Sequence, residues 1–227
     1  MSRNQSGDPK RRNDREQRKQ PGDAHNRQKQ TKPRNLAHQE QKSPRQKTMS
    51  PRKVESIILI GMPASGKSTA GVILAKVLGM DFLDTDLLIQ RRTGKRLPEL
   101  IEDYGVDGFL TLEENICCQV LTRQSVIATG GSVVYGERAM EHFRRLGTVV
   151  YLEVPYPLLM QRLKDVNGRG VVMHKGQTLE DLYKERVPLY EKYADIIVRE
   201  NGSGVESVVV EIAEKWQEFR KGPGQEQ

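Results

Sequence analysis

The chain has 227 residues, and its 37 Lys and Arg against 30 Asp and Glu give a formal net charge of +7. That length allows one ordinary α/β domain of roughly 100 to 200 residues together with an additional segment. No apolar run reaches transmembrane length and no signal-type apolar segment follows Met1, so we expect a cytoplasmic protein that does not engage a membrane. The two cysteines, Cys117 and Cys118, are neighbours in a predicted helix and are expected to be reduced, without a disulfide or a metal.

Basic residues are concentrated in the first 53 residues. This stretch holds 16 of the basic and 5 of the acidic residues, a net charge of +11, so residues 54–227 carry −4. Its only large apolar residues are Met1, Leu36 and Met49, too few to offset chain entropy by burial. We therefore predict a disordered basic tail over residues 1–53, with Met49 as an alternative start of the protein. Nucleic-acid binding by the tail is not expected, because no aromatic residues are interleaved for base stacking.

A phosphate-binding motif follows the tail. The apolar run at 57–60 predicts a buried strand, and residues 69–78 carry apolar side chains at helical spacing. Between them, GMPASGKS at 61–68 fills every fixed position of the pattern GxxxxGK[ST]. In such a loop backbone N–H groups converge on phosphate, the helix dipole favours the same anion, Lys67 adds positive charge and Ser68 offers a hydroxyl to Mg²⁺. The predicted nucleotide-binding residues are Gly61, Met62, Pro63, Ala64, Ser65, Gly66, Lys67, Ser68 and Thr69.

Two carboxylates end the next predicted strand, at residues 80–86. Because the carboxyl ends of parallel strands share one edge of a sheet, Asp84 and Asp86 are expected beside the phosphate loop. A carboxylate there can hold Mg²⁺ or take the proton of an attacking hydroxyl. The alternative is that Asp86 only caps a helix beginning at Leu87.

Strands and helices continue to alternate along the rest of the chain. Helices are predicted at 97–104, 107–122, 136–146, 155–163, 178–193 and 205–219, and strands at 125–129, 148–154 and 194–199. Gly130 and Gly131 at a strand end permit close approach of a ligand. The glycine-punctuated loop 164–177 is a predicted lid, whose Arg169 would close over the transferring phosphate. The alternation predicts an α/β three-layer sandwich, a five-stranded parallel sheet flanked by helices.

Taken in order, these motifs resemble the shikimate kinase family of small P-loop kinases. The resemblance covers residues 54 to about 220, leaving 221–227 as a predicted disordered C-terminus. It implies ATP-dependent phosphorylation, with Mg²⁺, of a hydroxyl on a small carboxylate metabolite. We expect the protein to be a monomer, although the sequence does not give the oligomeric state. The foremost acceptor is shikimate, which gives shikimate 3-phosphate in aromatic amino acid biosynthesis. The segments that carry the resemblance are GMPASGKST, the DTD at 84–86, Gly130-Gly131, Arg169 and the RVPLY at 186–190.

The resemblance also implies roles for individual residues. Lys67, Asp86 and Arg169 match catalytic positions, and Ser68 and Asp84 match the Mg²⁺ ligands. Arg162 matches an arginine beside the adenine, and Arg169 also reaches the ATP phosphates. The matching acceptor-binding residues are Asp86, Phe109, Gly130, Gly131 and Arg186.

Three positions depart from the family pattern. The family segment G-E-x-x-F-R-x-x-E is here GVDGFLTLE at 105–113. Val106 therefore stands in place of the first Glu and Leu110 in place of the Arg. In a separate turn, Ser132 stands in place of the third glycine of the family's GGG. A charge-assisted contact to a carboxylate contributes roughly 1.5 to 3 kcal/mol, so losing the Arg would weaken acceptor binding by about one to two orders of magnitude. Ser132 could donate a new hydrogen bond, but a serine at a turn is most often uninvolved, which is the outcome we expect. The alternatives are therefore another small alcohol, such as a homoserine-like amino acid or a sugar acid, or a nucleotide-binding regulatory protein that no longer transfers phosphate.

Overall fold

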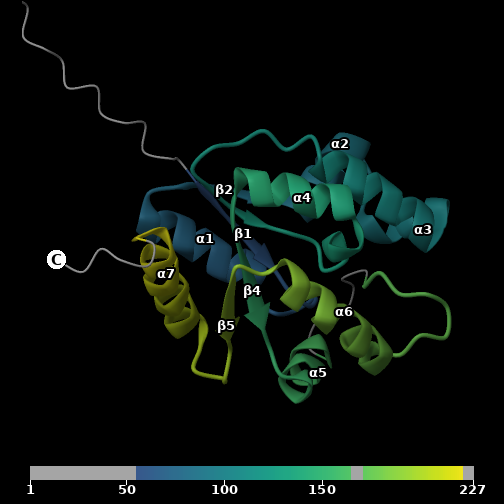
Figure 1. Cartoon of the computed structure of the whole chain (residues 1–227). Helices are drawn as coiled ribbons and strands as arrows, with labels where there is room; N and C mark the ends of the chain where they lie inside the picture. The colour runs from purple at the N-terminus through teal and green to yellow at the C-terminus, as the bar shows by residue number, and fades with distance from the viewer. Residues whose placement is uncertain (1–54, 165–170, 222–227) are drawn as a thin grey trace, which may run out of the picture. The chain divides into compact units, whose positions relative to one another are not determined.

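The computed structural model describes residues 55–164 and 171–221 (Figure 1). The chain divides into two units, Met1–Thr48 and Met49–Gln227, and the described residues belong to the second. The predicted tail at 1–53 and the residues after Lys221 lie outside the described residues. Lys221 itself, placed in the disordered C-terminus by the sequence, is the last residue of a helix.

A five-stranded parallel sheet forms the centre of the domain (Figure 1). The strand order is β2-β3-β1-β4-β5, so β1 lies between strands that come later in the chain. In such a sheet the carboxyl end of the central strand faces a crevice where ligands bind. The strands are β1 (Ser56–Ile60), β2 (Asp81–Asp84), β3 (Ser125–Ala128), β4 (Gly147–Glu153) and β5 (Ile196–Arg199).

Helices cover both faces of the sheet, which confirms the predicted α/β fold. They are α1 (Lys67–Leu78), α2 (Thr85–Thr93), α3 (Leu97–Cys117), α4 (Glu137–Leu146), α5 (Tyr156–Lys164), α6 (Leu179–Tyr193) and α7 (Val205–Lys221), with a 3₁₀ turn, η1, at Val133–Tyr135. Successive side chains of β1 point to opposite faces of the sheet. Ile57 and Leu59 pack in the core with α1 and α7, whereas Ile58 and Ile60 pack in the core with α4 and α6. All four side chains are fully buried, because both faces of the sheet are covered.

Two predicted element ends are wrong for local reasons. The strand predicted to run to Asp86 ends at Asp84, because the Asp84 carboxylate accepts the backbone N–H groups of Asp86 and Leu87 and caps α2. Asp84, and not Asp86, is therefore the capping residue. The helix predicted to reach Thr122 ends at Cys117, where the chain tightens and Val120 turns into the core.

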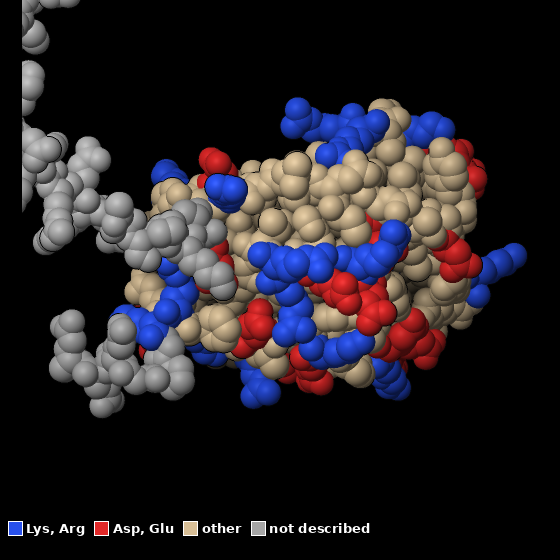
Figure 2. Space-filling view, turned by 45° about the horizontal axis from the view of Figure 1, so that its top comes forward, with Lys and Arg blue, Asp and Glu red and all other residues tan. Residues whose placement is uncertain are grey.

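The break predicted at Gly105 is confirmed. Gly105, at φ 68°, interrupts α3 between its two helical parts, as predicted. Cys117 and Cys118 are free thiols. None of the described helices is long and apolar enough to cross a membrane. On the face shown in Figure 2, acidic and basic side chains lie next to one another.

Candidate active site

The phosphate loop holds three residues at positive φ, of which two, Gly61 and Gly66, are glycines and the third is Ala64 at φ 62°. Gly61 has φ 147°, and a Cβ there would lie 2.7 Å from the Leu152 carbonyl oxygen on the neighbouring strand β4. Gly66 has φ 90° and is the N-cap residue just before α1, with no side chain capping the helix. The first N–H groups of α1 are therefore directed at the loop interior, where they can bind a phosphate.

Lys67 spans the mouth of this loop. Its Nζ donates hydrogen bonds to the carbonyl oxygens of Gly61 and Met62, both at 2.8 Å, and to Ser65 Oγ at 3.3 Å. The side chain is nearly buried. This places a positive charge where the outer phosphates of a nucleotide held by the loop would lie.

Ser68 and Asp84 approach each other from α1 and β2. Ser68 Oγ donates to Asp84 Oδ2 at 2.7 Å, while Asp84 Oδ1 accepts the two α2 N–H groups. The pair offers two hard oxygen donors beside the phosphate loop. That donor set fits Mg²⁺, which typically takes one or two protein oxygens and completes its shell with phosphate oxygens and water.

Asp86 lies in the first turn of α2, against the end of β3. Thr85, just before it, is fully buried, and its Oγ1 accepts the Gly130 N–H at 3.0 Å. A Cβ on Gly130 would lie 2.8 Å from Asp86 Oδ1. The glycine is thus needed for close approach, and the structure brings the predicted residues Asp86 and Gly130 together.

The Gly131 turn is fixed from two sides. A Cβ on Gly131 would lie 2.8 Å from the Pro63 ring in the phosphate loop, and Tyr190 Oη on α6 donates to the Gly131 carbonyl oxygen at 2.6 Å. Tyr190 is fully buried. The nucleotide loop and the predicted acceptor turn are therefore in direct contact.

Arg186 is a buried cation with unused hydrogen-bonding capacity. Only 1% of the residue is exposed. Its Nη2 donates to the Val172 carbonyl oxygen at 2.7 Å and its Nε to Tyr135 Oη at 3.2 Å, with the guanidinium 5.1 Å from the Tyr135 ring centre. Arg186 Nη1 has no hydrogen-bond partner among the described residues. A buried guanidinium N–H without an acceptor is costly, which points to a missing anionic ligand.

Glu113 is a site residue to which the sequence assigned no role. It lies on α3, is 1% exposed, and its Oε2 accepts a hydrogen bond from Ser132 Oγ at 2.6 Å. The expectation that Ser132 is uninvolved is wrong, because its buried hydroxyl holds this carboxyl. Burial raises the pKa of Glu113 to about 7, opposed by the Ser132 hydrogen bond and assisted by Asp86. The available sequence signal is a Glu four residues after Phe109, on the helix face that is otherwise apolar.

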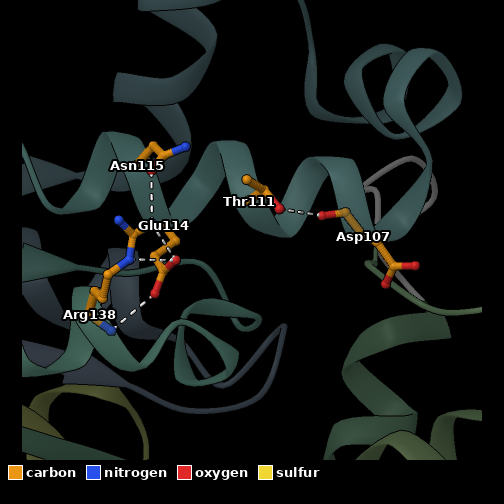
Figure 3. Close-up of polar contacts among 5 residues, drawn as sticks. All are labelled: Asp107, Thr111, Glu114, Asn115 and Arg138. Atoms are coloured by element: carbon orange, nitrogen blue, oxygen red, sulfur yellow. Dashed lines mark hydrogen bonds and ion pairs between the residues drawn. The ribbon is translucent and has the colours of Figure 1, made fainter.

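Leu110 lines a shallow pocket between α3 and η1. The other lining residues are Asp107, Thr111, Glu114, Tyr135 and Gly136. Figure 3 shows polar contacts of three of these lining residues: Arg138 donates to Glu114 Oε2 at 2.7 Å and to Asn115 Oδ1 at 3.0 Å, and Thr111 Oγ1 donates to the Asp107 carbonyl oxygen. Arg138 is thus paired with Glu114, which lines the same pocket as Leu110, and with Asn115.

Three further predicted residues stand apart from this cluster. Phe109 is buried in a core cluster with Ile89, Leu100, Ile116 and Val172, so its evident role is packing. Arg162 on α5 forms an ion pair with Glu200, Nη2 to Oε1 at 2.7 Å, and its place beside the adenine stays a prediction. Arg169 and the lid contact predicted for it lie outside the described residues.

The fold and the site together define a P-loop kinase. A family model described as shikimate kinase matches residues 63–217. Shikimate kinases of Clostridium botulinum strain 657 and Thermodesulfovibrio yellowstonii are 35% and 31% identical to this chain, covering 72% and 74% of it and 98% and 99% of themselves. The chain belongs to the shikimate kinase family, whose members are ATP-binding phosphotransferases with an alcohol acceptor.

Solved structures of shikimate kinases are similar to this chain. A shikimate kinase from Acinetobacter baumannii, in complex with shikimate, superposes with a TM-score of 0.67 at 31% identity, covering 75% of this chain and 96% of that one. A shikimate kinase from Aquifex aeolicus gives a TM-score of 0.61 at 30% identity, covering 74% and 99%.

Proposed function

We propose that this protein transfers the γ-phosphoryl group of ATP to a hydroxyl of shikimate, giving shikimate 3-phosphate. The observation that carries this is the buried Arg186, whose Nη1 has no hydrogen-bond partner among the described residues and whose charge, like that of Asp86, acts on the buried carboxyl of Glu113. To bind a hydroxy acid, a protein needs a cation that pairs with the acid's carboxylate and a carboxylate that accepts a hydrogen bond from the acid's hydroxyl. Relatives named shikimate kinase, one of them solved with shikimate, support the assignment.

The reaction is an in-line transfer governed by positioning and charge neutralisation. On this proposal the loop amides and Lys67 hold the phosphates. Ser68 and Asp84 hold Mg²⁺, which when bound neutralises charge on the phosphate oxygens. Asp86, close to Gly130, orients the acceptor hydroxyl and takes its proton as the new O–P bond forms.

One observation favours a second candidate acceptor. Leu110 places an apolar side chain at the position where the family has an arginine, so this pocket has one fewer cation for a carboxylate. A homoserine-like amino acid or a sugar acid is the competing substrate class, because a polar site discriminates strongly when one of its contacts is removed.

The test is an assay of ADP release by the full chain with shikimate, homoserine or gluconate, and without acceptor. We expect turnover with shikimate well above the other two, and slow ATP hydrolysis without acceptor. In parallel, Leu110→Arg should lower KM for shikimate by about 10- to 100-fold by restoring a charge-assisted contact. Preference for homoserine or gluconate would reassign the acceptor. ATP binding without any turnover would mean that transfer has been lost.

Replacing Ser68 with Ala should reveal the metal site. Removing one oxygen ligand is expected to raise the Mg²⁺ concentration for half-maximal activity by about tenfold, with a smaller change at saturating Mg²⁺. The measurement is a Mg²⁺ titration of the initial rate at fixed ATP. Ser207→Ala, on the exposed side of α7, is the control and should titrate as the natural protein does. An unshifted Ser68→Ala curve would remove Ser68 from the metal site.

A further inference from the structure

Tyr135 contacts the buried Arg186 with both its hydroxyl and its ring. It is the last residue of the turn η1, which packs against α6, the helix that carries Arg186. Tyr135 Oη accepts a hydrogen bond from Arg186 Nε at 3.2 Å, and the guanidinium carbon lies over the tyrosine ring, 5.1 Å from its centre. A cation over an aromatic face is attracted by the ring, so the two contacts act together on one group.

Two hydrogen bonds set the orientation of the Arg186 guanidinium. The group is planar and its five N–H donors have a fixed geometry. Nε is bonded to Tyr135 Oη, and Nη2 donates to the Val172 carbonyl oxygen at 2.7 Å. Because two different nitrogens of one rigid plane are held, the direction of the third is held as well. That third nitrogen, Nη1, has no partner in the part of the chain that the structure describes, which leaves it for a ligand.

The proton of the Tyr135 hydroxyl is directed away from the acceptor. Tyr135 Oη donates to Glu185 Oε1 at 2.7 Å, because an ionised carboxylate can only accept. The other oxygen of Glu185 accepts a hydrogen bond from Gln177 Nε2 at 2.7 Å, so this carboxylate is held at both ends. While Glu185 keeps its place, Tyr135 has no proton to donate to a bound carboxylate. Its contribution to acceptor binding is therefore made through Arg186.

This arrangement keeps the charge of Arg186 available. The two hydrogen-bond partners described above, a hydroxyl and a carbonyl, are neutral groups. The negative charge lies one residue further on, at the exposed Glu185, and reaches Arg186 through the tyrosine. Hydrogen bonds in such a chain polarise one another, so the anion strengthens the bond from Nε to Oη. A direct ion pair would instead compete with the carboxylate of the acceptor for the same cation.

We propose that Tyr135 is a positioning residue of the acceptor site, whose hydroxyl and ring hold the Arg186 guanidinium with Nη1 directed at the acceptor carboxylate. The inference rests on the proposed function, in which Arg186 binds that carboxylate. Tyr135 also lines the same shallow pocket as Leu110, which supplies no cation. Recognition of the carboxylate therefore depends strongly on how Arg186 is oriented.

The first test compares steady-state constants of Tyr135→Phe and the natural full chain. The change keeps the ring and removes the oxygen that accepts the Nε hydrogen bond. KM for shikimate should rise about three- to tenfold, while kcat and KM for ATP stay within about twofold. Tyr135→Leu, which also removes the ring, should raise KM for shikimate a further two- to fivefold.

Tyr104→Phe is the matched control, because Tyr104 lies on α3 and is 58% exposed. It should leave all three constants unchanged. Melting curves of each variant show whether the fold is kept. A lower Tm in Tyr135→Phe with KM for shikimate unchanged would give Tyr135 a purely structural role and overturn the inference.

The second test asks whether Tyr135 acts through Arg186 or touches the acceptor itself. Tyr135→Phe is combined with Arg186→Gln, and shikimate affinity is measured by calorimetry in the presence of a non-hydrolysable ATP analogue. If Tyr135 only positions Arg186, the double variant should bind shikimate within about twofold of Arg186→Gln, because residues that act as one unit are not additive. Effects that multiply would show direct contact with the acceptor and overturn the positioning role.

The outcomes separate the inference from the function on which it rests. Weakened binding in Arg186→Gln together with natural affinity in Tyr135→Phe would overturn the role of Tyr135 and leave shikimate as the acceptor. Natural affinity in a folded Arg186→Gln protein would remove the carboxylate ligand of the proposed function and the positioning role with it. If the natural chain does not bind shikimate, both fail.

Discussion

Asp86→Asn is expected to lower the turnover number with shikimate by roughly 10²- to 10⁴-fold, the usual contribution of a general base. Asn keeps the size of the side chain and can still contact a hydroxyl, but it cannot accept a proton. ATP affinity should change little, since the phosphate contacts belong to the loop and Lys67 and not to the first turn of α2.

The measurement is steady-state ADP release at saturating acceptor, together with the Kd for ATP. Asp81→Asn is the matched control, because Asp81 is exposed at the opposite end of the same strand, β2, and should leave turnover unchanged. Near-normal turnover in Asp86→Asn would exclude Asp86 as the base. A parallel loss of ATP affinity would indicate a disturbed phosphate loop instead.

Arg186→Gln is expected to raise KM for shikimate by about 10- to 100-fold. A charge-assisted hydrogen bond to a carboxylate contributes roughly 1.5 to 3 kcal/mol, and Arg186 Nη1, which has no partner within residues 55–164 and 171–221, is the donor available for it. Arg186→Lys should recover only part of this effect, because lysine keeps the charge but loses the planar pair of donors. KM for ATP should be unaffected by either change.

Thermal melting must accompany this experiment, because Arg186 also bonds the Val172 carbonyl and Tyr135 from a buried position. Arg199→Gln is the control: Arg199 is paired with Glu153 at the surface of β5 and should change neither KM nor Tm appreciably. A folded Arg186→Gln protein with unchanged KM for shikimate would rule out Arg186 as the carboxylate ligand.

Much of the fold could be predicted because its signals are local. The buried run of β1, the helical spacing of α1 and the glycines between them each depend on neighbours in the sequence. The approach of Asp84 to Ser68 was predictable from the sheet topology, because the carboxyl ends of parallel strands lie at one edge of the sheet. Element ends were less accurate. The start of α2 depends on the hydrogen bonds of one side chain, that of Asp84. The early end of α3 depends on where Val120 becomes buried.

The sequence by itself determined the phosphate loop, the parallel sheet and the family, and it indicated Asp86 and Arg186 as the carboxylate and arginine of the proposed acceptor site. Only the tertiary structure decided the character of the acceptor pocket. Ser132 and Glu113 are 19 residues apart. Glu113 lies on an otherwise apolar helix face, but no local pattern indicates that Ser132 is its partner. The charge of Glu113 depends on desolvation and on Asp86, Arg186 and Lys67 from other helices. Such long-range burial exists only after the chain has folded, because water would otherwise solvate each group separately.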